Sequence, residues 1–396
     1  MSKFEEIQQR EKNVLFQTYS RYPLAAVRGK GARLWDADGK EYIDLLSGIA
    51  VTSLGHCNEE VTKVLCEQAG TLVHVSNLLY QENQVRLAER LLTTNHFDKV
   101  FFCNSGAEAN ETAIKLARRY MQCVRRNGAF EVITFENAFH GRTLGTLAAT
   151  GQVKLQEGFA PMPEGFKQVP WNDLAALEAA ITPQTAAVMI EMVQGESGIR
   201  PVTPDFAKGI EAICRKKGVL FIVDEVQAGL CRSGRFWCFQ NFDIKPDIIS
   251  CAKALANGLP IGAVMSTNEV AQAFPFGSHG TTFGGGPLLT AVADKVVEIM
   301  IRDQLDKRAA KLGTAFLARL REVAAKHTDK IKEVRGLGLL IGIELTEPGK
   351  DIWLKLIHKG FVINLSHDTV LRLLPPLIIE EADLNAFADA LDEVLA

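Results

Sequence analysis

Residues 219–227 read VLFIVDEVQ, and this stretch decides the class of fold. An uninterrupted apolar run, rich in β-branched residues, ends at two acids, Asp224 and Glu225. Such a run is typical of a strand buried on both faces of a parallel sheet that helices cover. Since ligands bind open α/β sheets at the carboxyl ends of the strands, an acid at this position is placed to face a ligand. Taken alone, it fits a cap on the following turn equally well.

Apolar runs of the same kind recur on both sides of this one. They are Val100–Cys103, Val132–Phe135, Ala187–Val193, Ile248–Cys251 and Gly262–Ser266. Helical patterns such as Glu108–Val124 and Pro204–Lys217 lie between them. This alternation predicts an α/β fold in which helices cover both faces of a mostly parallel sheet.

The two ends of the chain have a different pattern. A D-x-D-G turn at residues 36–39 between alternating runs predicts a hairpin. The last third predicts a long amphipathic helix, three strand-like stretches and a final helix; these are Pro287–Lys326, Ile331–Glu344, Gly360–Asn364, Val370–Leu374 and the residues from about Glu380 onward. We expect a large α/β domain over residues 46–288, and a smaller α+β domain made of residues 1–45 and 289–396.

Composition excludes several classes of function. Of the 396 residues 47% are hydrophobic and 23% are charged, as is usual for a globular protein. The net charge of -3 offers no basic surface for nucleic acid or an anionic membrane. No apolar run reaches the roughly 18 residues of a membrane span, and the charged N-terminus is unlike a signal peptide. The eight cysteines have neither C-x-x-C nor zinc-like spacing. We therefore expect reduced thiols, no metal and a cytoplasmic location.

A first candidate for binding chemistry is FFCNSGAEAN at residues 101–110. A strand ends there and a helix begins, with Ser105 as N-cap and Glu108 in capping-box position. The free N–H groups of a helix N-terminus bind phosphate. In isolation, an ordinary capped helix is the simpler interpretation.

Two further segments carry reactive side chains. Phe139 could stack on a flat ring, and Arg142 in the same loop could grip a carboxylate. Lys253 follows another apolar strand, where burial would favour the free amine that Schiff-base chemistry needs. Each has a simpler alternative: a core phenylalanine, a surface arginine and a surface lysine.

Together these segments offer a phosphate cradle, a stacking aromatic, an acid and a lysine on one sheet. Pyridoxal 5′-phosphate needs this combination, because its aldehyde takes a lysine, its pyridine nitrogen a carboxylate and its phosphate N–H donors. We therefore expect this cofactor.

Almost the whole chain resembles the class III (ω-amino acid) aminotransferases, which are fold-type I pyridoxal-phosphate enzymes, and within them the acetylornithine aminotransferases. The motifs that carry the resemblance are YSRYP at 19–23, WDADGKEYID at 35–44, GIAV at 48–51, LGHC at 54–57, HVSN at 74–77, FFCNSGAEAN at 101–110, FHGRTLG at 139–145, DEVQ at 224–227, TTFGG at 281–285 and LRLLPPL at 371–377. One departure is Asn58-Glu59, where the family usually has His-Pro; it affects the start of a helix more than the chemistry.

The resemblance implies a role for each cofactor-binding residue. Lys253 corresponds to the lysine that takes the cofactor aldehyde and shuttles a proton. Asp224 pairs with the pyridine nitrogen, Gln227 approaches the ring hydroxyl, and Phe139 stacks on the ring. The phosphate site is formed by Ser105, Gly106 and Ala107, with Thr282 from a neighbouring subunit, which implies a homodimer with shared active sites.

The resemblance also implies the substrate contacts. Arg142 holds the carboxylate far from the reacting amine, and Arg372 holds the α-carboxylate of glutamate or 2-oxoglutarate, with Glu196 as its switchable partner. Tyr19 joins the substrate site.

The implied reaction transfers the terminal amine of N2-acetylornithine to 2-oxoglutarate, in arginine biosynthesis. Other donors stay open: ornithine, succinylornithine, succinyl-diaminopimelate and 4-aminobutyrate. A pyridoxal-phosphate aminomutase or decarboxylase is a further alternative, although two arginines suited to carboxylates argue against an aminomutase. A binding protein without activity is disfavoured by the intact set of Lys253, Asp224 and Arg142.

Overall fold

The central sheet of the protein has seven strands in the order β4-β12-β11-β10-β7-β5-β6. The computed structural model describes residues 2–396. The strands are β4 (Lys99–Cys103), β5 (Glu131–Phe135), β6 (Phe166–Val169), β7 (Thr185–Ile190), β10 (Leu220–Asp224), β11 (Ile248–Cys251) and β12 (Gly262–Ser266). β12 is antiparallel to both its neighbours, whereas the pairings among β11, β10, β7, β5 and β6 are parallel. The prediction of a mostly parallel α/β sheet is confirmed.

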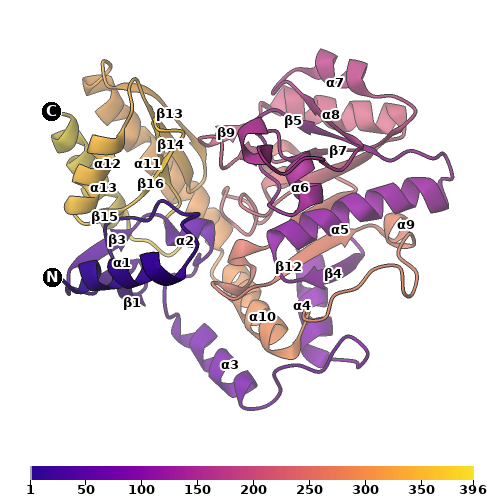
Figure 1. Ribbon diagram of the computed structural model, residues 1–396, viewed down its shortest axis with the longest axis horizontal. Coiled ribbons are helices and arrows are strands. Elements are labelled where there is room, and N and C mark those ends of the chain that lie inside the picture. The colour runs from indigo at the N-terminus through magenta and orange to yellow at the C-terminus, as the bar shows by residue number, and fades with distance from the viewer. Residues whose placement is uncertain (1) are drawn as a thin grey trace.

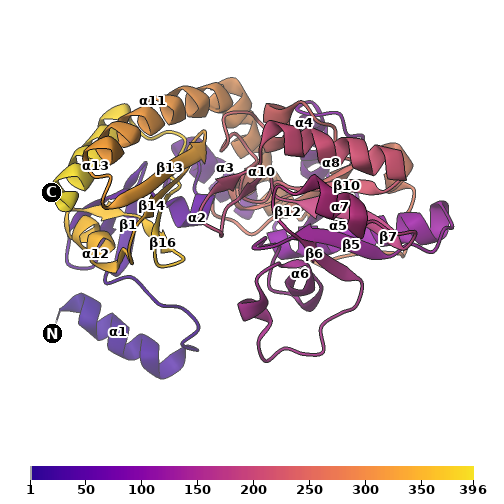
Figure 2. The ribbon, with the colours of Figure 1, turned by 90° about the horizontal axis from the view of Figure 1, so that it is seen from above.

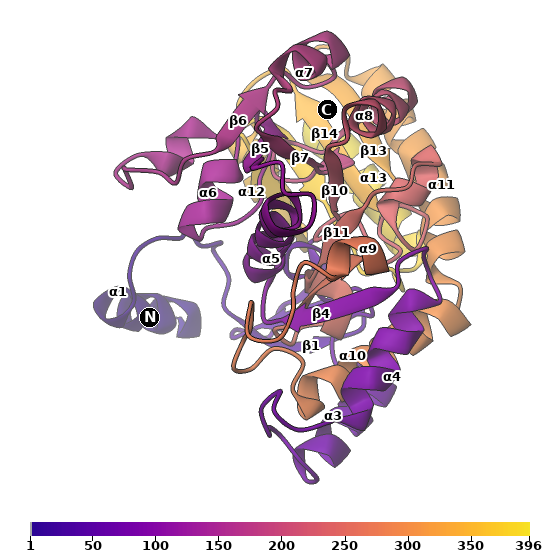
Figure 3. The same cartoon turned by 90° about the vertical axis from the view of Figure 1, so that its right-hand side faces the viewer.

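Helices cover both faces of this sheet, with α5 on one side and α4, α8 and α10 on the other (Figure 3). The helices of this part are α2 (Ser47–Ala50), α3 (Glu59–Ala69), α4 (Glu82–Leu92), α5 (Gly106–Arg119), α6 (Leu144–Ala149), α7 (Leu174–Ala180), α8 (Pro204–Lys217), α9 (Asn268–Ala271) and α10 (Pro287–Arg302). Short turns of 3-10 or π helix are Tyr120–Val124, Val153–Gln156, Cys238–Phe242 and Lys253–Ala256.

Strand β10 explains why its sequence has no polar alternation. Phe221 and Val223 pack in the core that includes α8, whereas Leu220 and Ile222 pack in the core that includes α5. Both faces of the strand are therefore dry, and an apolar residue is favoured at every position until Asp224 at its end.

A second lobe, at the left of Figure 1, holds two four-stranded sheets. The first consists of β1 (Ala26–Lys30), β2 (Arg33–Asp36), β3 (Glu41–Asp44) and β15 (Phe361–Val362), and the second of β13 (Ile331–Leu337), β14 (Leu340–Leu345), β17 (Val370–Leu373) and β16 (Asn364–Ser366). The helices α11 (Leu305–Lys326), α12 (Lys350–His358) and α13 (Glu381–Leu395) complete it. Since β3 pairs with β15, the two ends of the chain share a sheet. We call this the small lobe, and the part around the seven-stranded sheet the large lobe.

The expectation of one helix over Pro287–Lys326 is wrong. The segment forms α10 and α11, because Gln304, the N-cap of α11, has a left-handed φ of 50° and interrupts the helix after the C-cap Asp303. The bend lets α10 pack on α3 and α4 in the large lobe, while α11 packs on β13 and α13 in the small lobe. Packing in two places, rather than local propensity, decides this break.

Helix α1 (Lys3–Val14) stands apart from both lobes in Figure 2 and buries none of its residues. The segment after it exposes Phe16 and Tyr19. Among residues 2–396, no helix is long and apolar enough to cross a membrane.

Candidate active site

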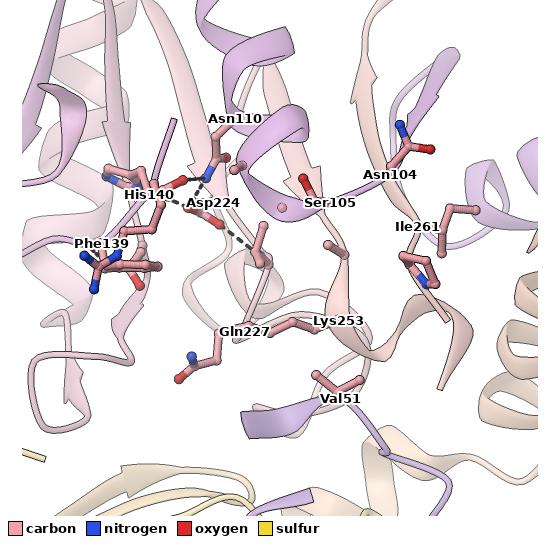
Figure 4. A pocket seen from close by; sticks show the side chains of 18 of the residues that line it. Val51, Asn104, Ser105, Asn110, Phe139, His140, Asp224, Gln227, Lys253 and Ile261 are labelled. Atoms are coloured by element: carbon pink, nitrogen blue, oxygen red, sulfur yellow. Dashed lines mark hydrogen bonds and ion pairs between the residues drawn. The ribbon is translucent and has the colours of Figure 1, made fainter. Parts of the chain in front are cut away.

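A cavity of about 460 Å³ lies at the carboxyl ends of strands β4, β10 and β11 (Figure 4). Most of the site residues expected from the sequence line it. They are Ser105, Gly106, Ala107, Phe139, Arg142, Asp224, Gln227 and Lys253. The fold therefore gathers side chains that are up to about 150 positions apart in the sequence.

The N-terminus of α5 forms one wall of the cavity. Ser105 Oγ accepts the N–H of Glu108 at 3.2 Å, as expected for the N-cap. The Glu108 carboxylate reaches back to the N–H of Asn104 at 2.7 Å, one residue before the cap. A Cβ on Gly106 would lie 2.7 Å from Val226 Cγ1, so only glycine lets the helix start this close to β10. Among the described residues, the N–H groups of Gly106 and Ala107 in the first turn have no hydrogen-bond partner and are free for an anion.

Asp224 is nearly fully buried and held by three donors. Its Oδ2 accepts from Asn110 Nδ2 at 2.7 Å and His140 Nδ1 at 2.8 Å, and its Oδ1 accepts from the N–H of Val226 at 2.9 Å. Burial would lower the pKa of His140, but the hydrogen bond and charge of Asp224 outweigh it and raise that pKa. The carboxylate is thus fixed in orientation, and Figure 4 shows it with both side-chain partners.

Sequence analysis did not assign these two partners of Asp224. Asn110 lies four residues after Gly106, on the same face of α5, and this spacing is the signal that could have found it. His140 is next to the expected stacking residue Phe139, but nothing local shows that its ring turns toward Asp224.

Glu225, the second acid of the pair, faces away from the cavity. Its carboxylate accepts the N–H groups of Cys238 and Phe239, both at 2.8 Å, and so caps a 3-10 turn. Burial raises its pKa to about 8. Asp224 therefore both lines the cavity and caps the turn that follows it through the N–H of Val226, whereas Glu225 caps a more distant turn.

Lys253 begins the turn that follows β11, with a left-handed φ of 45°. A non-glycine residue in this region is strained, and such strain gathers at functional sites. Burial lowers the pKa of its ammonium, against the opposing charge of Glu196. The position therefore favours a free, nucleophilic amine that faces the cavity.

Beside the cavity, Arg372 and Glu196 form an ion pair. Arg372 Nη1 lies 2.7 Å from Glu196 Oε1, and the arginine side chain is only 2% exposed. Arg372 also donates to Asn364 Oδ1 at 2.9 Å and to the carbonyl of Gly195 at 3.0 Å. Burial would raise the pKa of Glu196, but the charges of Arg372 and Lys253 lower it to about 2. Glu196 is therefore ionised at neutral pH.

Phe139, the residue expected to stack on the cofactor ring, is held by a glutamate that was not expected from the sequence. The Phe139 N–H donates to Glu191 Oε2 at 3.0 Å, and burial raises the pKa of Glu191 to about 7. Arg142 is exposed, with its guanidinium carbon 5.7 Å from the centre of the Phe139 ring. Phe139 and Arg142 thus lie next to each other at the cavity, as their places in one loop led us to expect.

Two expected site residues are not brought to this cavity within one chain. Tyr19 is 73% exposed, in the segment after α1. Thr282 is exposed on the loop between α9 and α10, and it is not among the residues that line the cavity.

The residues of the cavity fit pyridoxal 5′-phosphate. They supply a lysine amine, a fixed carboxylate, free N–H groups and an aromatic ring, each on a different element. Among the described residues, Gln227 Oε1 is buried and has no hydrogen-bond partner, whereas its Nε2 donates to Glu196 at 3.1 Å. This unused acceptor suits the ring hydroxyl of the cofactor.

Comparison with known proteins agrees with this geometry. The aminotransferase class-III family matches residues 16–395. The chain is 49% identical to an acetylornithine aminotransferase of Methanocaldococcus jannaschii, covering 97% of this chain and 96% of that one. The ornithine aminotransferase of Toxoplasma gondii has a similar structure, with a TM-score of 0.96, 33% identity and coverage of 100% and 95%. An acetylornithine aminotransferase of Elizabethkingia anophelis superposes with a TM-score of 0.90 at 34% identity, covering 99% and 98%.

A sheet of this topology with a lysine, an acid and a helix N-terminus at its carboxyl edge defines a pyridoxal-phosphate enzyme of the aminotransferase type. The chain belongs to the class III aminotransferases. It is an enzyme that transfers amino groups with pyridoxal 5′-phosphate as cofactor.

Proposed function

We propose that this aminotransferase moves the terminal amine of N2-acetylornithine to 2-oxoglutarate, giving N-acetylglutamate 5-semialdehyde and glutamate, a reaction of arginine biosynthesis. The Arg372–Glu196 ion pair beside Lys253 is the observation that supports the half-reaction with an ω-amine donor. The 49% identity to an acetylornithine aminotransferase supports the acetylated donor.

Residues that line the cavity would hold the cofactor. Asp224 takes the pyridine nitrogen, Gln227 the ring hydroxyl and Phe139 the face of the ring. Ser105, Gly106 and Ala107 would hold the phosphate. When bound, pyridoxal 5′-phosphate supplies an electron-poor ring that stabilises negative charge at the substrate carbon. Lys253 Nζ would take the proton from that carbon and pass it to the cofactor in the first half of the exchange, and would carry a proton the opposite way in the second half, because its lowered pKa lets the amine act as a base.

The two arginines divide the recognition of substrate carboxylates. Arg142 holds the carboxylate distant from the reacting amine, in both substrates. Arg372 holds the carboxylate beside the reacting carbon, which only glutamate and 2-oxoglutarate have. With acetylornithine, Glu196 stays on Arg372 and avoids an unpaired buried charge; with glutamate it leaves.

The active unit in this proposal is a homodimer in which Thr282, and with it the segment of Tyr19, reaches the partner's site. Its support is that both residues are exposed and away from their own cavity. Large apolar side chains near the same loop are exposed as well, among them Leu78, Tyr80, Phe276 and Phe283. Large apolar side chains that are exposed close together are typical of a protein–protein interface.

The proposal also covers the location of the enzyme in the cell and the division of the chain into domains. We place the enzyme in the cytoplasm, since all eight cysteines are free, as is usual in a reducing compartment. We also propose that residues 46–288 act as one domain and residues 1–45 with 289–396 as another.

A panel of amine donors with 2-oxoglutarate tests the function. N2-acetylornithine is expected to give the highest kcat/KM among acetylornithine, succinylornithine, ornithine, succinyl-diaminopimelate and 4-aminobutyrate. A tenfold preference for any other donor would overturn the proposed substrate. Rearrangement of an amino acid without 2-oxoglutarate would indicate an aminomutase.

A further inference from the structure

The loop that carries Glu196 is held by the opposite lobe. Residues 195–199, here called the gate loop, connect β8 (Val193–Gln194) to β9 (Arg200–Pro201) and belong to the large lobe. Their carbonyls accept hydrogen bonds from side chains of the small lobe. Ser366 Oγ and His367 Nε2 both donate to the carbonyl of Glu196, at 2.9 and 3.0 Å.

Arg335 of β13 makes the largest share of these contacts. Its Nε donates to the carbonyls of Gly198 and Ile199 at 3.0 and 2.9 Å, and its Nη2 donates to Gly198 at 2.7 Å. Glu333 and Glu344 both pair with Nη1 and fix the guanidinium from the other side. The side chain is only 13% exposed. Charge-assisted hydrogen bonds of this kind are among the stronger ones in proteins.

Close packing adds to this attachment. Ile199 is fully buried, and a Cβ on Gly342 of β14 would lie 2.9 Å from the carbonyl oxygen of Gly198. Gly198 has a left-handed φ of +84°, and a Cβ there would lie 3.0 Å from Val370 Cγ2. The gate loop therefore has little room to move against the small lobe.

A fixed main chain limits how Glu196 can leave Arg372. Since the carbonyls of Glu196, Gly198 and Ile199 are all held by the small lobe, we expect the carboxylate to leave by rotation of the Glu196 side chain rather than by movement of the main chain. The same attachment keeps the carboxylate close to Arg372 whenever no substrate carboxylate competes for it.

We propose that Arg335, assisted by Ser366 and His367, is a positioning residue that ties the gate loop to the small lobe and thereby sets the preference between ω-amine and α-amine substrates. This inference rests on the proposed function, because it concerns how the same Glu196 acts. Loosening the loop lowers the local concentration of the carboxylate at Arg372. Arg372 is then bare more often, which favours 2-oxoglutarate and glutamate and disfavours acetylornithine.

The test compares the two half-reactions of the holoenzyme in single-turnover experiments. For Arg335→Ala we expect the ratio of kcat/KM for acetylornithine to that for glutamate to fall by about tenfold, the effect of losing hydrogen bonds that hold one conformer. Ser366→Ala should shift the ratio in the same direction by a smaller factor. The matched control is Lys332→Ala. Lys332 pairs with Glu344 at 2.7 Å on the same sheet and makes no hydrogen bond to the gate loop. The ratio of the two kcat/KM values should stay unchanged in this variant.

A double-mutant cycle shows whether Arg335 acts through Glu196. In a Glu196→Ala background, Arg335→Ala should leave the ratio unchanged, because no carboxylate remains to be positioned. An equal loss in both half-reactions, or a shift of the same size without Glu196, would overturn the proposal. If Arg335→Ala does not fold, the same cycle is measured with Ser366→Ala. An unchanged ratio for Ser366→Ala in the background that retains Glu196 would then overturn the proposal.

Failure of the proposed function has a different signature. It would appear in the wild type as absence of turnover with acetylornithine. The cycle would then be measured with the best ω-amine donor of the panel, and the same outcomes would decide it.

Discussion

At the residue scale, the chemistry depends on charged side chains whose surroundings differ. Asp224 is buried, and three hydrogen bonds to its carboxylate fix the orientation of that group. Lys253 is desolvated, which favours its neutral form. Arg372 is buried and paired with Glu196. These three states suit three different roles, which are holding a protonated ring, moving a proton and binding a carboxylate on demand.

Replacing Asp224 tests the first of these roles. Asp224→Asn keeps the shape but removes the charge that holds the pyridine nitrogen protonated. We expect the cofactor to bind still, while kcat falls at least about a hundredfold, or roughly 3 kcal/mol of barrier. Steady-state kinetics on variant protein with its cofactor content measured would check this. An unchanged kcat would mean that another group holds the nitrogen.

Replacing Arg372 tests the division of carboxylate recognition. Arg372→Ala should raise KM for 2-oxoglutarate at least about thirtyfold, since a buried charged contact is worth about 2–5 kcal/mol. The half-reaction with acetylornithine should change much less, because that substrate has no carboxylate on the reacting carbon. Stopped-flow measurement of each half-reaction separates the two effects. Equal losses in both would leave Arg372 with a structural role only.

At the scale of elements, the sequence predicted the buried strands well because burial on both faces leaves a strong signal. The run VLFIV over 219–223 includes all of β10 except its last residue, and Pro204–Lys217 matches α8 residue for residue. β6 was missed because an edge strand with Lys167 and Gln168 lacks that signal. The break at Gln304 and the separate paths of Asp224 and Glu225 depend on packing between distant elements, which no local pattern contains.

The start of α5 offers a prediction at this scale. In Gly106→Ala the new Cβ would lie 2.7 Å from Val226 Cγ1, so we expect the helix N-terminus to shift away from the turn that follows β10. We expect the dissociation constant for pyridoxal 5′-phosphate to rise about tenfold, which corresponds to the loss of roughly one good anion contact. Gly70→Ala is the control, because a Cβ there would lie no nearer than 3.7 Å to other atoms. Equal cofactor retention in both variants would contradict this role of the helix N-terminus.

At the scale of the whole molecule, the site extends beyond one chain in our proposal. Eight of the expected residues meet in one cavity, and Glu196 and Arg372 pair beside it. Tyr19 and Thr282 lie elsewhere. The sequence could indicate Tyr19 as a substrate-site residue and Thr282 as a contact to the partner's site only through resemblance to a family, because a contact between subunits leaves no periodic pattern within either chain.

Subunit mixing tests the shared site. Lys253→Ala lacks the reactive amine, and a Thr282 variant lacks the proposed phosphate contact in the partner's site. Mixing the two inactive proteins should restore part of the activity, since one site of each hybrid dimer then contains both residues. No recovery, with subunit exchange confirmed by mass spectrometry, would place Thr282 in the site of its own chain.

The most direct test of the proposed function follows the amino group itself. The holoenzyme is incubated with 2-oxoglutarate and N2-acetylornithine that carries a heavy nitrogen isotope in its terminal amine, and the products are measured by mass spectrometry. We predict that glutamate carries the label, that N-acetylglutamate 5-semialdehyde carries none, and that the two products form in equal amounts. Unlabelled glutamate, or label that stays in the acetylornithine, would contradict the proposed transfer.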